Sequence, residues 1–415
     1  MKRFKEMTDL KKTNKTKSGL ELLSVFILIY FSNDTLLFGT NKNDIFLYIH
    51  IMVLAVVAGY WFLKKPTFET KGLYLLLILA FLNIVTMLIS GDGLLKYVYQ
   101  IFIMFLALII VNNIRLQDFA KHYNNVIFVL GIASIIIFFI NMFFVSLVTV
   151  FPKVSNENDV VYYYMGLGFA NIPEYASIPR MYGIFREPGV FMIFLVLALL
   201  FEILADKEPS IKRSAVYVVA MLLTFSTAAY ILIAASVVLM FTKLSADKIN
   251  SRKTRIFKVF LASVLAIAVV IFFVGTEEIF KMVFRKLYID NSSAASRMGS
   301  IETNLRIFYP KPIFGNGWSF LENNFERLAN FYGYIDGGHN TNTLLKILAI
   351  YGIPYFSIVA IGMFNFWKRI NRSLILGIIV FVLWIVALSN EDLSVNILTY
   401  ILVFYGFSNL RFRMN

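Results

Sequence analysis

The sequence predicts an all-α fold, a polytopic integral membrane protein with about twelve transmembrane helices. Three observations support this prediction: apolar runs long enough to cross a bilayer recur along the chain, basic residues gather between them, and the middle of the runs is nearly free of charge. Hydrophobic residues make up 59% of the 415 positions and charged residues 15%, with a mean hydropathy of +0.73. A soluble domain could not bury so much apolar surface, whereas about 20 apolar residues cross the ~30 Å hydrocarbon core of a bilayer.

Eleven apolar runs follow one another in the chain. The first five cover residues 20–38, 45–63, 73–90, 94–111 and 126–148. The next three cover residues 189–205, 214–242 and 257–275, and the last three cover residues 342–366, 373–389 and 393–409. All except 214–242 have about the length that one helical crossing requires.

The run 214–242 is interrupted by the segment Thr224-Phe225-Ser226-Thr227, and Lys and Arg residues flank the run on both sides. A single crossing would place one of these basic clusters outside. Two short crossings that turn at the Ser/Thr segment place both clusters inside, as the positive-inside rule favours. We therefore predict two helices in this run and twelve in the chain.

Twelve crossings place both termini in the cytoplasm. Of the 39 Lys and Arg residues, 26 then lie in cytoplasmic segments and 11 in outer segments. The net charge of +14 thus has a topological explanation, and nucleic acid is not expected as a partner. Because the chain has no cysteine, disulfides, iron–sulfur clusters and thiol catalysis are excluded.

Two connections on the outer side are long, at about 149–188 and 276–341, and long loops of ordinary composition usually carry function. In the second loop, residues 277–288 place apolar side chains on one face and predict a helix at the membrane interface. Ser319 and Glu322 have the spacing of a capping box and predict a second short helix. We expect residues 1–415 to form a single transmembrane domain with these two external loops.

Two segments that open outer helix ends resemble an anion site. The first is Arg180-Met-Tyr-Gly-Ile-Phe-Arg186-Glu187-Pro188-Gly189, where Pro188 suits the first turn of a helix and Arg186 stands beside unpaired backbone amides. The second is Gly337-Gly338-His339-Asn340-Thr341, where Asn340 or Thr341 can cap the helix that follows. Helix N-termini with Arg beside them favour a phosphate or pyrophosphate. The alternative is a pair of ordinary caps in which Arg186 pairs with Glu187.

A third segment, from Arg306 to Trp318, contains two Pro and two Gly residues and predicts a tight turn. Arg306 and Lys311 could add positive charge to the anion site, and Trp318 could stack on a sugar ring or mark the interface. The chain has no Asp-x-Asp pair, only three histidines and no P-loop or Rossmann fingerprint. We therefore expect no metal, no cofactor and no use of ATP.

Four motifs in this order resemble the O-antigen polymerase and ligase superfamily of bacterial envelope proteins, which includes the Wzy-type polysaccharide polymerases. They are Phe185–Gly189 at a helix start, Thr224–Thr227 at a helix turn, Pro312–Gly317, and Gly338-His339-Asn340 ahead of Leu344. The similarity covers roughly residues 160–360. Each motif alone is weak, and the ordered set is more specific.

This resemblance implies an enzyme of the bacterial inner (plasma) membrane, a metal-independent glycosyltransferase that acts at its outer face. The expected donor is an undecaprenyl-pyrophosphate-linked oligosaccharide, and a polymerase transfers the growing chain onto the next lipid-linked repeat unit. The product would be O-antigen of a lipopolysaccharide, a capsule or a related polymer. Membrane lipids, a chain-length regulator and a flippase are the other expected partners.

The resemblance also implies roles for individual residues. Arg186, with Arg180 or Arg306, would neutralise the pyrophosphate leaving group. His339 would accept the proton of the acceptor hydroxyl, because the ordinary pKa of histidine suits a base at neutral pH, and Glu187 is the competing base. The residues expected to bind the pyrophosphate are Arg180, Arg186, Arg306, Asn340 and Lys346.

Three other functions remain open. An O-antigen ligase of the same superfamily would transfer the glycan to lipid A core instead of a repeat unit. A flippase or exporter of lipid-linked oligosaccharides would also have about twelve helices, but it predicts charged residues deep in the membrane and short outer loops. A purely structural partner in an envelope complex is the third alternative.

Overall fold

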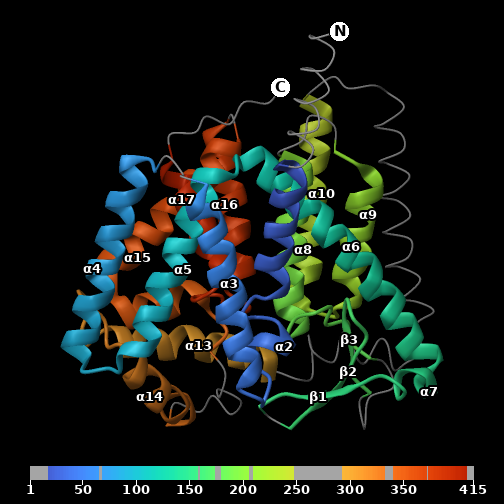
Figure 1. Cartoon of the computed structure of the whole chain (residues 1–415), viewed down its shortest axis with the longest axis horizontal. Coiled ribbons are helices and arrows are strands. Elements are labelled where there is room, and N and C mark those ends of the chain that lie inside the picture. The colour runs from blue at the N-terminus through green and yellow to red at the C-terminus, as the bar shows by residue number, and fades with distance from the viewer. Residues whose placement is uncertain are drawn as a thin grey trace.

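The structure is a computed structural model of the whole chain. It describes residues 17–64, 68–157, 159–172, 179–204, 209–246, 292–331, 340–371 and 373–408. Long helices run side by side in a bundle, and one end of the bundle carries short helices and a small sheet (Figure 1). We call this end, which holds α2, the sheet, α13 and α14, the loop end.

The first half of the chain is mostly helical. Residues 17–30 form a helix. It is followed by α2 (Leu36–Gly39), α3 (Ile45–Leu63), α4 (Thr70–Ser90), α5 (Leu94–Asn113), α6 (Leu116–Phe143) and α7 (Val145–Val148). Three strands come next, β1 (Lys153–Ser155), β2 (Val161–Tyr164) and β3 (Phe169–Ala170).

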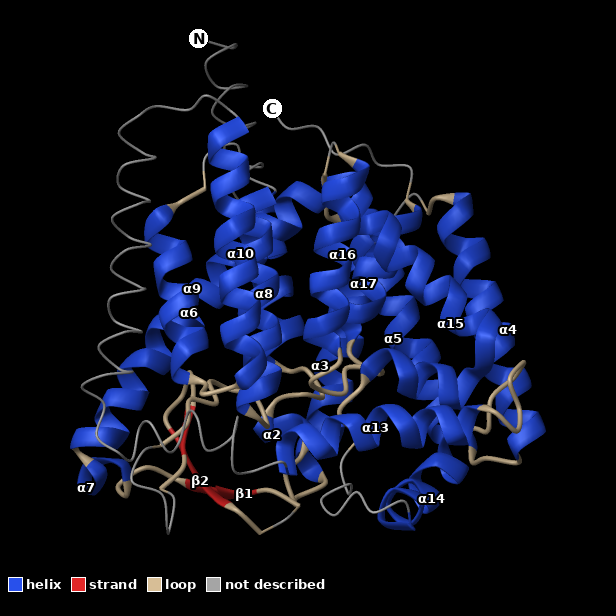
Figure 2. Cartoon of the chain, turned by 180° about the vertical axis from the view of Figure 1, so that it is seen from behind, coloured by secondary structure: helices blue, strands red, loops and turns tan. Residues whose placement is uncertain are grey.

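In the second half, a run of apolar helices is interrupted by two polar ones at the loop end. The helices are α8 (Pro188–Leu204), α9 (Ile211–Leu223), α10 (Thr227–Ala246), α13 (Ser292–Phe308), α14 (Trp318–Phe331), α15 (Thr343–Ile370), α16 (Leu374–Leu388) and α17 (Ile397–Phe407). Figure 2 shows α13 lying across the ends of the long helices, with α14 beside it.

Five of the described helices, α3, α4, α5, α6 and α15, are long and apolar enough to cross a membrane. Shorter apolar helices are α8, α16, α17 and residues 227–240 of α10. Large apolar side chains such as Leu63 and Leu95 face outward on these helices, where lipid would cover them. The chain is therefore a membrane protein with many helical segments.

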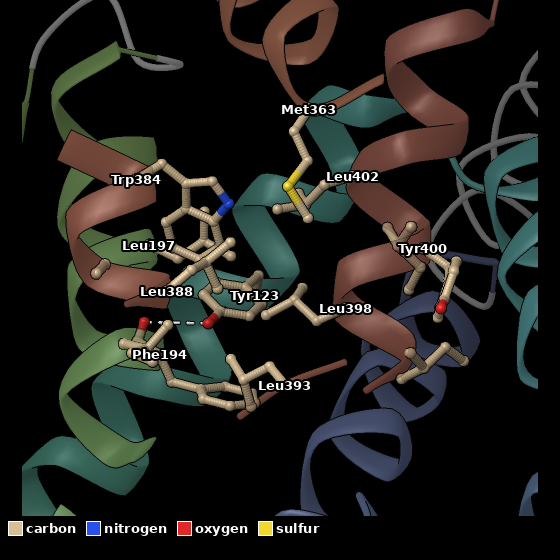
Figure 3. Close-up of a cluster of buried hydrophobic side chains, with 14 of the residues drawn as sticks. Tyr123, Phe194, Leu197, Met363, Trp384, Leu388, Leu393, Leu398, Tyr400 and Leu402 are labelled. Atoms are coloured by element: carbon tan, nitrogen blue, oxygen red, sulfur yellow. Dashed lines mark hydrogen bonds between the residues drawn. The ribbon is translucent and has the colours of Figure 1, made fainter. Parts of the chain in front are cut away.

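The core of the bundle surrounds α8, in which all 17 residues are buried. Figure 3 shows side chains of this core, with Leu197 and Phe194 of α8 against Tyr123, Trp384 and Met363 from three other helices. The hydroxyl of Tyr123 donates a hydrogen bond of 3.0 Å to the carbonyl of Phe194. A fully encircled α8 holds its N-terminus in a fixed place at the loop end.

The helix break predicted within 214–242 is confirmed, because α9 ends at Leu223 and α10 begins at Thr227. The predicted helices over 257–275 and 277–288 lie outside the described residues. Contacts place the start of the first helix and the end of α17 at one end of the bundle, since Glu21 meets His122 near the start of α6 and the Tyr405 hydroxyl donates to the carbonyl of Ile114, just before α6. This arrangement agrees with termini on a common side, and the side itself stays a prediction.

The prediction of an all-α fold is wrong in the first long loop. There, β1, β2 and β3 form an antiparallel sheet, with Lys153 opposite Tyr163 and Tyr164 opposite Phe169. The run Val161–Tyr164 is β-branched and aromatic, which favours a strand. Tyr162 is buried and packs with Phe169 and with Leu36 of α2, so the sheet has an apolar face against α2.

The predicted capping box of α14 is replaced by a cap from another element. Asp92, in the turn between α4 and α5, accepts the backbone N–H groups of Trp318 (2.6 Å) and Ser319 (3.3 Å). Glu322 pairs with Lys96 on α5. A long-range carboxylate therefore fixes the start of α14, and its pKa is lowered because these hydrogen bonds outweigh the effect of burial.

Candidate functional site

A pocket of about 140 Å³ lies at the loop end, where five segments distant in sequence meet. Its lining residues are Arg180, Glu187, Pro188, Gly189, Ser226, Thr227, Arg297, Thr341, Asn390 and Glu391. They come from the starts of α8 and α10, from α13, and from the segments that precede α15 and α17. The pocket is polar, although it adjoins the fully buried helix α8.

The first wall of the pocket is the start of α8. Pro188 occupies the first helical turn, as the sequence predicts, because its missing N–H would have no partner there. Gly189 follows and lies directly against the carboxyl group of Glu391, so that a Cβ at this position would clash with Oε1 of Glu391. The glycine thus allows a buried carboxyl group to approach the helix start.

The turn between α9 and α10 forms the second wall. Phe225 adopts a positive φ of 49°, which ends α9, and the Thr224 hydroxyl donates to the Met221 carbonyl at 2.7 Å. The carbonyl of Thr224 accepts a hydrogen bond of 3.2 Å from Nε of Arg180. This contact places Arg180 beside Ser226 and Thr227, where α10 begins.

The third wall is α13, which presents Arg297 to the pocket. Ser300 and Asn304 follow at three and seven residues, so they share a face with Arg297. The amides of Asn304 and Asn340 exchange two hydrogen bonds (2.9 and 2.8 Å), and Ser300 Oγ accepts the backbone N–H of Thr341 at 3.3 Å. The same face of α13 therefore holds Arg297 and the chain that leads into α15.

Two predicted pyrophosphate ligands lie elsewhere on this framework. Arg306 is nine residues beyond Arg297, which on an α-helix is about 13 Å along the axis and on the opposite face. It pairs with Glu302 and does not line the pocket. Asn340 is engaged by Asn304, and Thr341 lines the pocket instead.

The start of α15 is capped by neither residue that the sequence suggested. The side chain of Asn342 accepts the backbone N–H of Leu345 at 2.9 Å and is the cap. Thr343 then donates through its hydroxyl to the carbonyl of Glu391 at 2.7 Å and accepts the N–H of Leu393 at 2.9 Å. The helix start and the segment 389–396, which leads into α17, are thereby joined.

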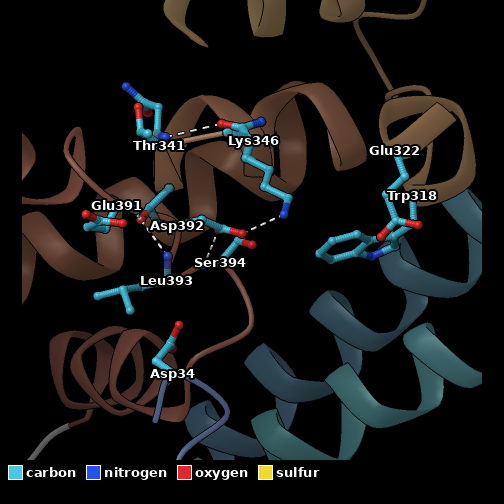
Figure 4. Close-up of polar contacts among 12 residues, drawn as sticks. Asp34, Trp318, Glu322, Thr341, Lys346, Glu391, Asp392, Leu393 and Ser394 are labelled. Carbon is cyan, nitrogen blue, oxygen red and sulfur yellow. Dashed lines mark hydrogen bonds and ion pairs between the residues drawn. The ribbon is translucent and has the colours of Figure 1, made fainter. Parts of the chain in front are cut away.

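Lys346, another predicted ligand, faces away from the pocket. Figure 4 shows its side chain reaching Asp392, with the Trp318 indole close to its ammonium group. The Lys346–Asp392 distance is 2.5 Å, and Nζ lies 4.8 Å from the centre of the Trp318 ring. Trp318 is buried and donates to the hydroxyl of Tyr351 at 2.8 Å, so its ring is not open to a sugar.

Arg186 stands behind the pocket and joins three segments. Its Nε lies 3.1 Å from Oδ1 of Asp34, and one terminal nitrogen donates to the carbonyl of Asp392 at 2.9 Å. Glu187 is 3.8 Å away, so the predicted Arg186–Glu187 contact is present but is not the main one. Burial raises the pKa of Asp34, and the Arg186 guanidinium opposes this shift. Arg186 does not line the pocket.

The motif Pro312–Gly317 docks onto a break in α15. Pro354 has no N–H to offer the carbonyl of Ile350, and that carbonyl accepts the N–H of Gly317 at 3.1 Å. In the same way, the carbonyl of Ala349 accepts the N–H of Asn316 at 3.0 Å. The loop between α13 and α14 thus completes the backbone hydrogen bonding of a kinked transmembrane helix.

The electrostatics of the pocket favour an anion. Arg180 and Arg297 form no ion pair with any residue that the structure describes, although both line the same small pocket. Burial lowers the pKa of Arg297, Glu391 opposes this change and the nearby Arg180 adds to it. Two half-buried cations that repel each other are stabilised by a ligand with two or more negative charges.

His339, the predicted base, lies outside the described residues, whereas Glu187, the competing base, lines the pocket. The sequence reasoning missed Arg297 and Glu391. A recognisable signal for Arg297 was the polar face formed with Ser300 and Asn304 on a helix of low hydropathy. Among the described residues, no group of three or more His, Asp or Glu side chains could hold a metal ion.

Comparison with known families agrees with the motifs. Residues 214–360 match the family model described as O-antigen ligase, a range that contains Ser226, Thr227, Arg297 and Thr341 of the pocket. None of the curated proteins compared with the chain matches it. This match supports the resemblance to the O-antigen polymerase and ligase superfamily that the motifs indicate.

Proposed function

We propose that the protein is a polysaccharide polymerase that transfers a glycan from undecaprenyl pyrophosphate onto a lipid-linked repeat unit at the outer face of the inner membrane. The observation that carries this proposal is the pair Arg180 and Arg297, which face one pocket without a carboxylate partner among the described residues. A pyrophosphate carries enough negative charge to pair with both arginines. Three helix starts, at α8, α10 and α15, border the pocket and add their positive ends.

In this proposal, Arg180 and Arg297 bind the pyrophosphate and stabilise the charge that develops as it leaves. Arg186 holds the segments of the pocket together through Asp34 and Asp392. The acceptor hydroxyl enters from the side of Glu187, which is about half exposed. The loop end then faces the outer side of the membrane, as the distribution of Lys and Arg predicts.

The test compares two arginines of the same helix. Arg297→Ala removes a charge-assisted contact, worth about 1.5–3 kcal/mol or roughly 10- to 150-fold in rate, and should shorten or abolish the polymer. Arg306→Ala removes a half-exposed pair with Glu302, worth about 0.3–0.5 kcal/mol, and should leave chain length unchanged. Both variants are expressed in a strain that lacks the wild-type gene, with the amount of protein in the membrane measured by immunoblot. Wild-type chain lengths from Arg297→Ala would contradict the proposal.

The second candidate is an O-antigen ligase, which the description of the matched family favours. The same deletion strain distinguishes the two reactions. Loss of a polymerase leaves a single repeat unit attached to its final acceptor, whereas loss of a ligase leaves none attached. The ladder of attached units on a gel therefore decides between them.

A further inference from the structure

A pair of carboxyl groups occupies one wall of the arginine pocket. Glu391, in the segment between α16 and α17, is 8% exposed, and its carboxyl group lies against Gly189 in the pocket that Glu187 also lines. Glu187 precedes α8 and its side chain is 47% exposed. Two carboxyl groups that line one small pocket repel each other when both are ionised, which favours a pair that holds one proton.

The surroundings determine where that proton lies. Burial raises the pKa of Glu391 far above its usual range, the charge of Glu187 raises it further, and Arg186 and Arg297 only partly oppose these effects. The charged groups around the pair are Arg186 beside Glu187, Arg297 on α13, Arg180 on the opposite wall and Asp392 next in the chain. The buried Glu391 therefore keeps the proton of the pair.

We propose that Glu187 and Glu391 act as a carboxyl pair with one proton, in which Glu187 is the general base for the acceptor hydroxyl and Glu391 is a positioning residue that donates a hydrogen bond to Glu187. This inference rests on the proposed function, which leaves the identity of the base open. It assigns Glu391 a role that depends on its being uncharged.

The transfer step balances as follows. The acceptor hydroxyl oxygen forms a bond to the anomeric carbon as its proton passes to the free oxygen of Glu187. The bond between the anomeric carbon and the phosphate oxygen breaks, and both its electrons stay on the pyrophosphate, whose charge Arg180 and Arg297 stabilise. Both carboxyl groups of the pair are then neutral, and the proton gained by Glu187 passes to solvent, because this side chain is half exposed.

An uncharged Glu391 also explains how a carboxyl group can stand in a pyrophosphate pocket. A second carboxylate so close would repel the phosphate oxygens, whereas a protonated carboxyl group does not. The close approach at Gly189 fixes Glu391 at the start of α8, where it reaches Glu187. In this proposal Glu187 accepts the proton, and Glu391 holds the carboxyl group of Glu187 in the orientation for that transfer.

The experiment uses spheroplasts of the deletion strain, whose outer face is accessible to buffer and whose membrane holds the native lipid-linked units. Polymer formation is measured between pH 5 and 9 for wild type and for Glu187→Gln, Glu391→Gln and Glu391→Leu. Glu322→Gln is the matched control, because Glu322 is a carboxylate of the loop end that pairs with Lys96 away from the pocket. Each variant is also purified, and its affinity for added undecaprenyl pyrophosphate is measured.

We expect Glu187→Gln to lose 100-fold or more of the rate, as loss of a general base does, with less than a threefold change in affinity for undecaprenyl pyrophosphate. Glu391→Leu should lose at least 20-fold. Glu391→Gln should recover most of that loss, because its amide N–H also donates a hydrogen bond to Glu187. A Gln variant as inactive as the Leu variant would overturn the role of Glu391, and an active Glu187→Gln would overturn the role of Glu187.

The pH profile adds a readout that a merely structural role would not change. In wild type, the KM for the lipid-linked unit should rise at alkaline pH, where Glu391 ionises and repels the pyrophosphate, and this rise should be absent in Glu391→Gln. A flat KM in wild type would contradict the proposal. If Arg297→Ala binds undecaprenyl pyrophosphate and forms polymer as wild type does, the proposed function is contradicted. If the Glu187 and Glu391 variants behave as wild type while Arg297→Ala does not, only the proposed carboxyl pair is contradicted.

Discussion

The contact between Asp34 and Arg186 offers a sharp test of how the pocket is held together. Asp34, ahead of α2, has a side chain that is 4% exposed, and its two oxygens meet Arg186 at 3.1 Å and the Asn396 amide at 2.5 Å. These contacts join the first helix, the start of α8 and the segment that leads into α17. Asp34→Ala should therefore destabilise the loop end far more than a surface substitution would.

The magnitude follows from the groups left behind. Removing one partner of a buried ion pair costs about 3–5 kcal/mol, and we take about 3 kcal/mol because Arg186 keeps the Asp392 carbonyl and some exposure. Asn396 loses a hydrogen-bond acceptor, which adds about 1 kcal/mol. The expected loss is about 4 kcal/mol. Arg186→Met in the Asp34→Ala background should restore about 2 kcal/mol, since the unpaired charge is then gone.

The assay is equilibrium unfolding of the purified protein in mixed detergent and dodecyl sulfate micelles, followed by circular dichroism. Wild type, the two single variants and the double variant complete a double-mutant cycle. A loss below 1 kcal/mol for Asp34→Ala would refute the assigned role of the pair. A double variant whose loss equals the sum of the single losses would show that the two side chains act independently.

Three further predictions concern the same framework. Gly315→Ala should cost at least 2 kcal/mol in the same unfolding assay, because the φ of Gly315 is +68° and a Cβ would strike the Ile350 carbonyl. Gly91→Ala is the control and should cost about 1 kcal/mol, because Gly91 has a similar φ of +71° but open space around it. Asp92→Ala should lower stability by about 2 kcal/mol and expose α14 to limited proteolysis, since two backbone N–H groups lose their acceptor; an unchanged digestion pattern would contradict this. The raised pKa of Glu391 means that the folded wild type loses stability as the pH rises above the usual carboxyl range. Glu391→Gln removes this loss, so its stability relative to wild type should increase over the same range. An equal dependence of stability on pH in both proteins would contradict this prediction.

The long helices could be predicted from the sequence because lipid imposes a simple rule on composition. In lipid, a run of about 20 apolar residues forms a helix to satisfy its own backbone, and the Ser/Thr interruption marked the break between α9 and α10. The small sheet was missed because its longest strand, Val161–Tyr164, spans only four residues. A signal so short has no period that distinguishes it from an ordinary loop.

The site was predicted in part, and the errors have a common cause. Arg180 and Glu187 lie in the pocket because they are close in sequence to the helix start that the Pro-Gly pair marks. Arg306 was preferred to Arg297 because it stands near the Pro312–Gly317 motif. In α13 these two arginines lie on opposite faces of the helix. The contact of Asn304 with Asn340 determines which of the two faces turns toward the pocket.

The structure separates motifs that shape the backbone from side chains that can do chemistry. Pro312–Gly317 completes the hydrogen bonding of a kinked helix, Thr224–Thr227 ends one helix and begins another, and Gly189 makes room for a carboxyl group. Arg297 and Glu391 lie outside every motif that carried the resemblance. The motifs thus identify the architecture, and the reaction depends on residues that this architecture brings together. A substitution such as Arg297→Lys, which keeps the charge and alters the geometry of its donors, should accordingly leave the fold intact and weaken transfer.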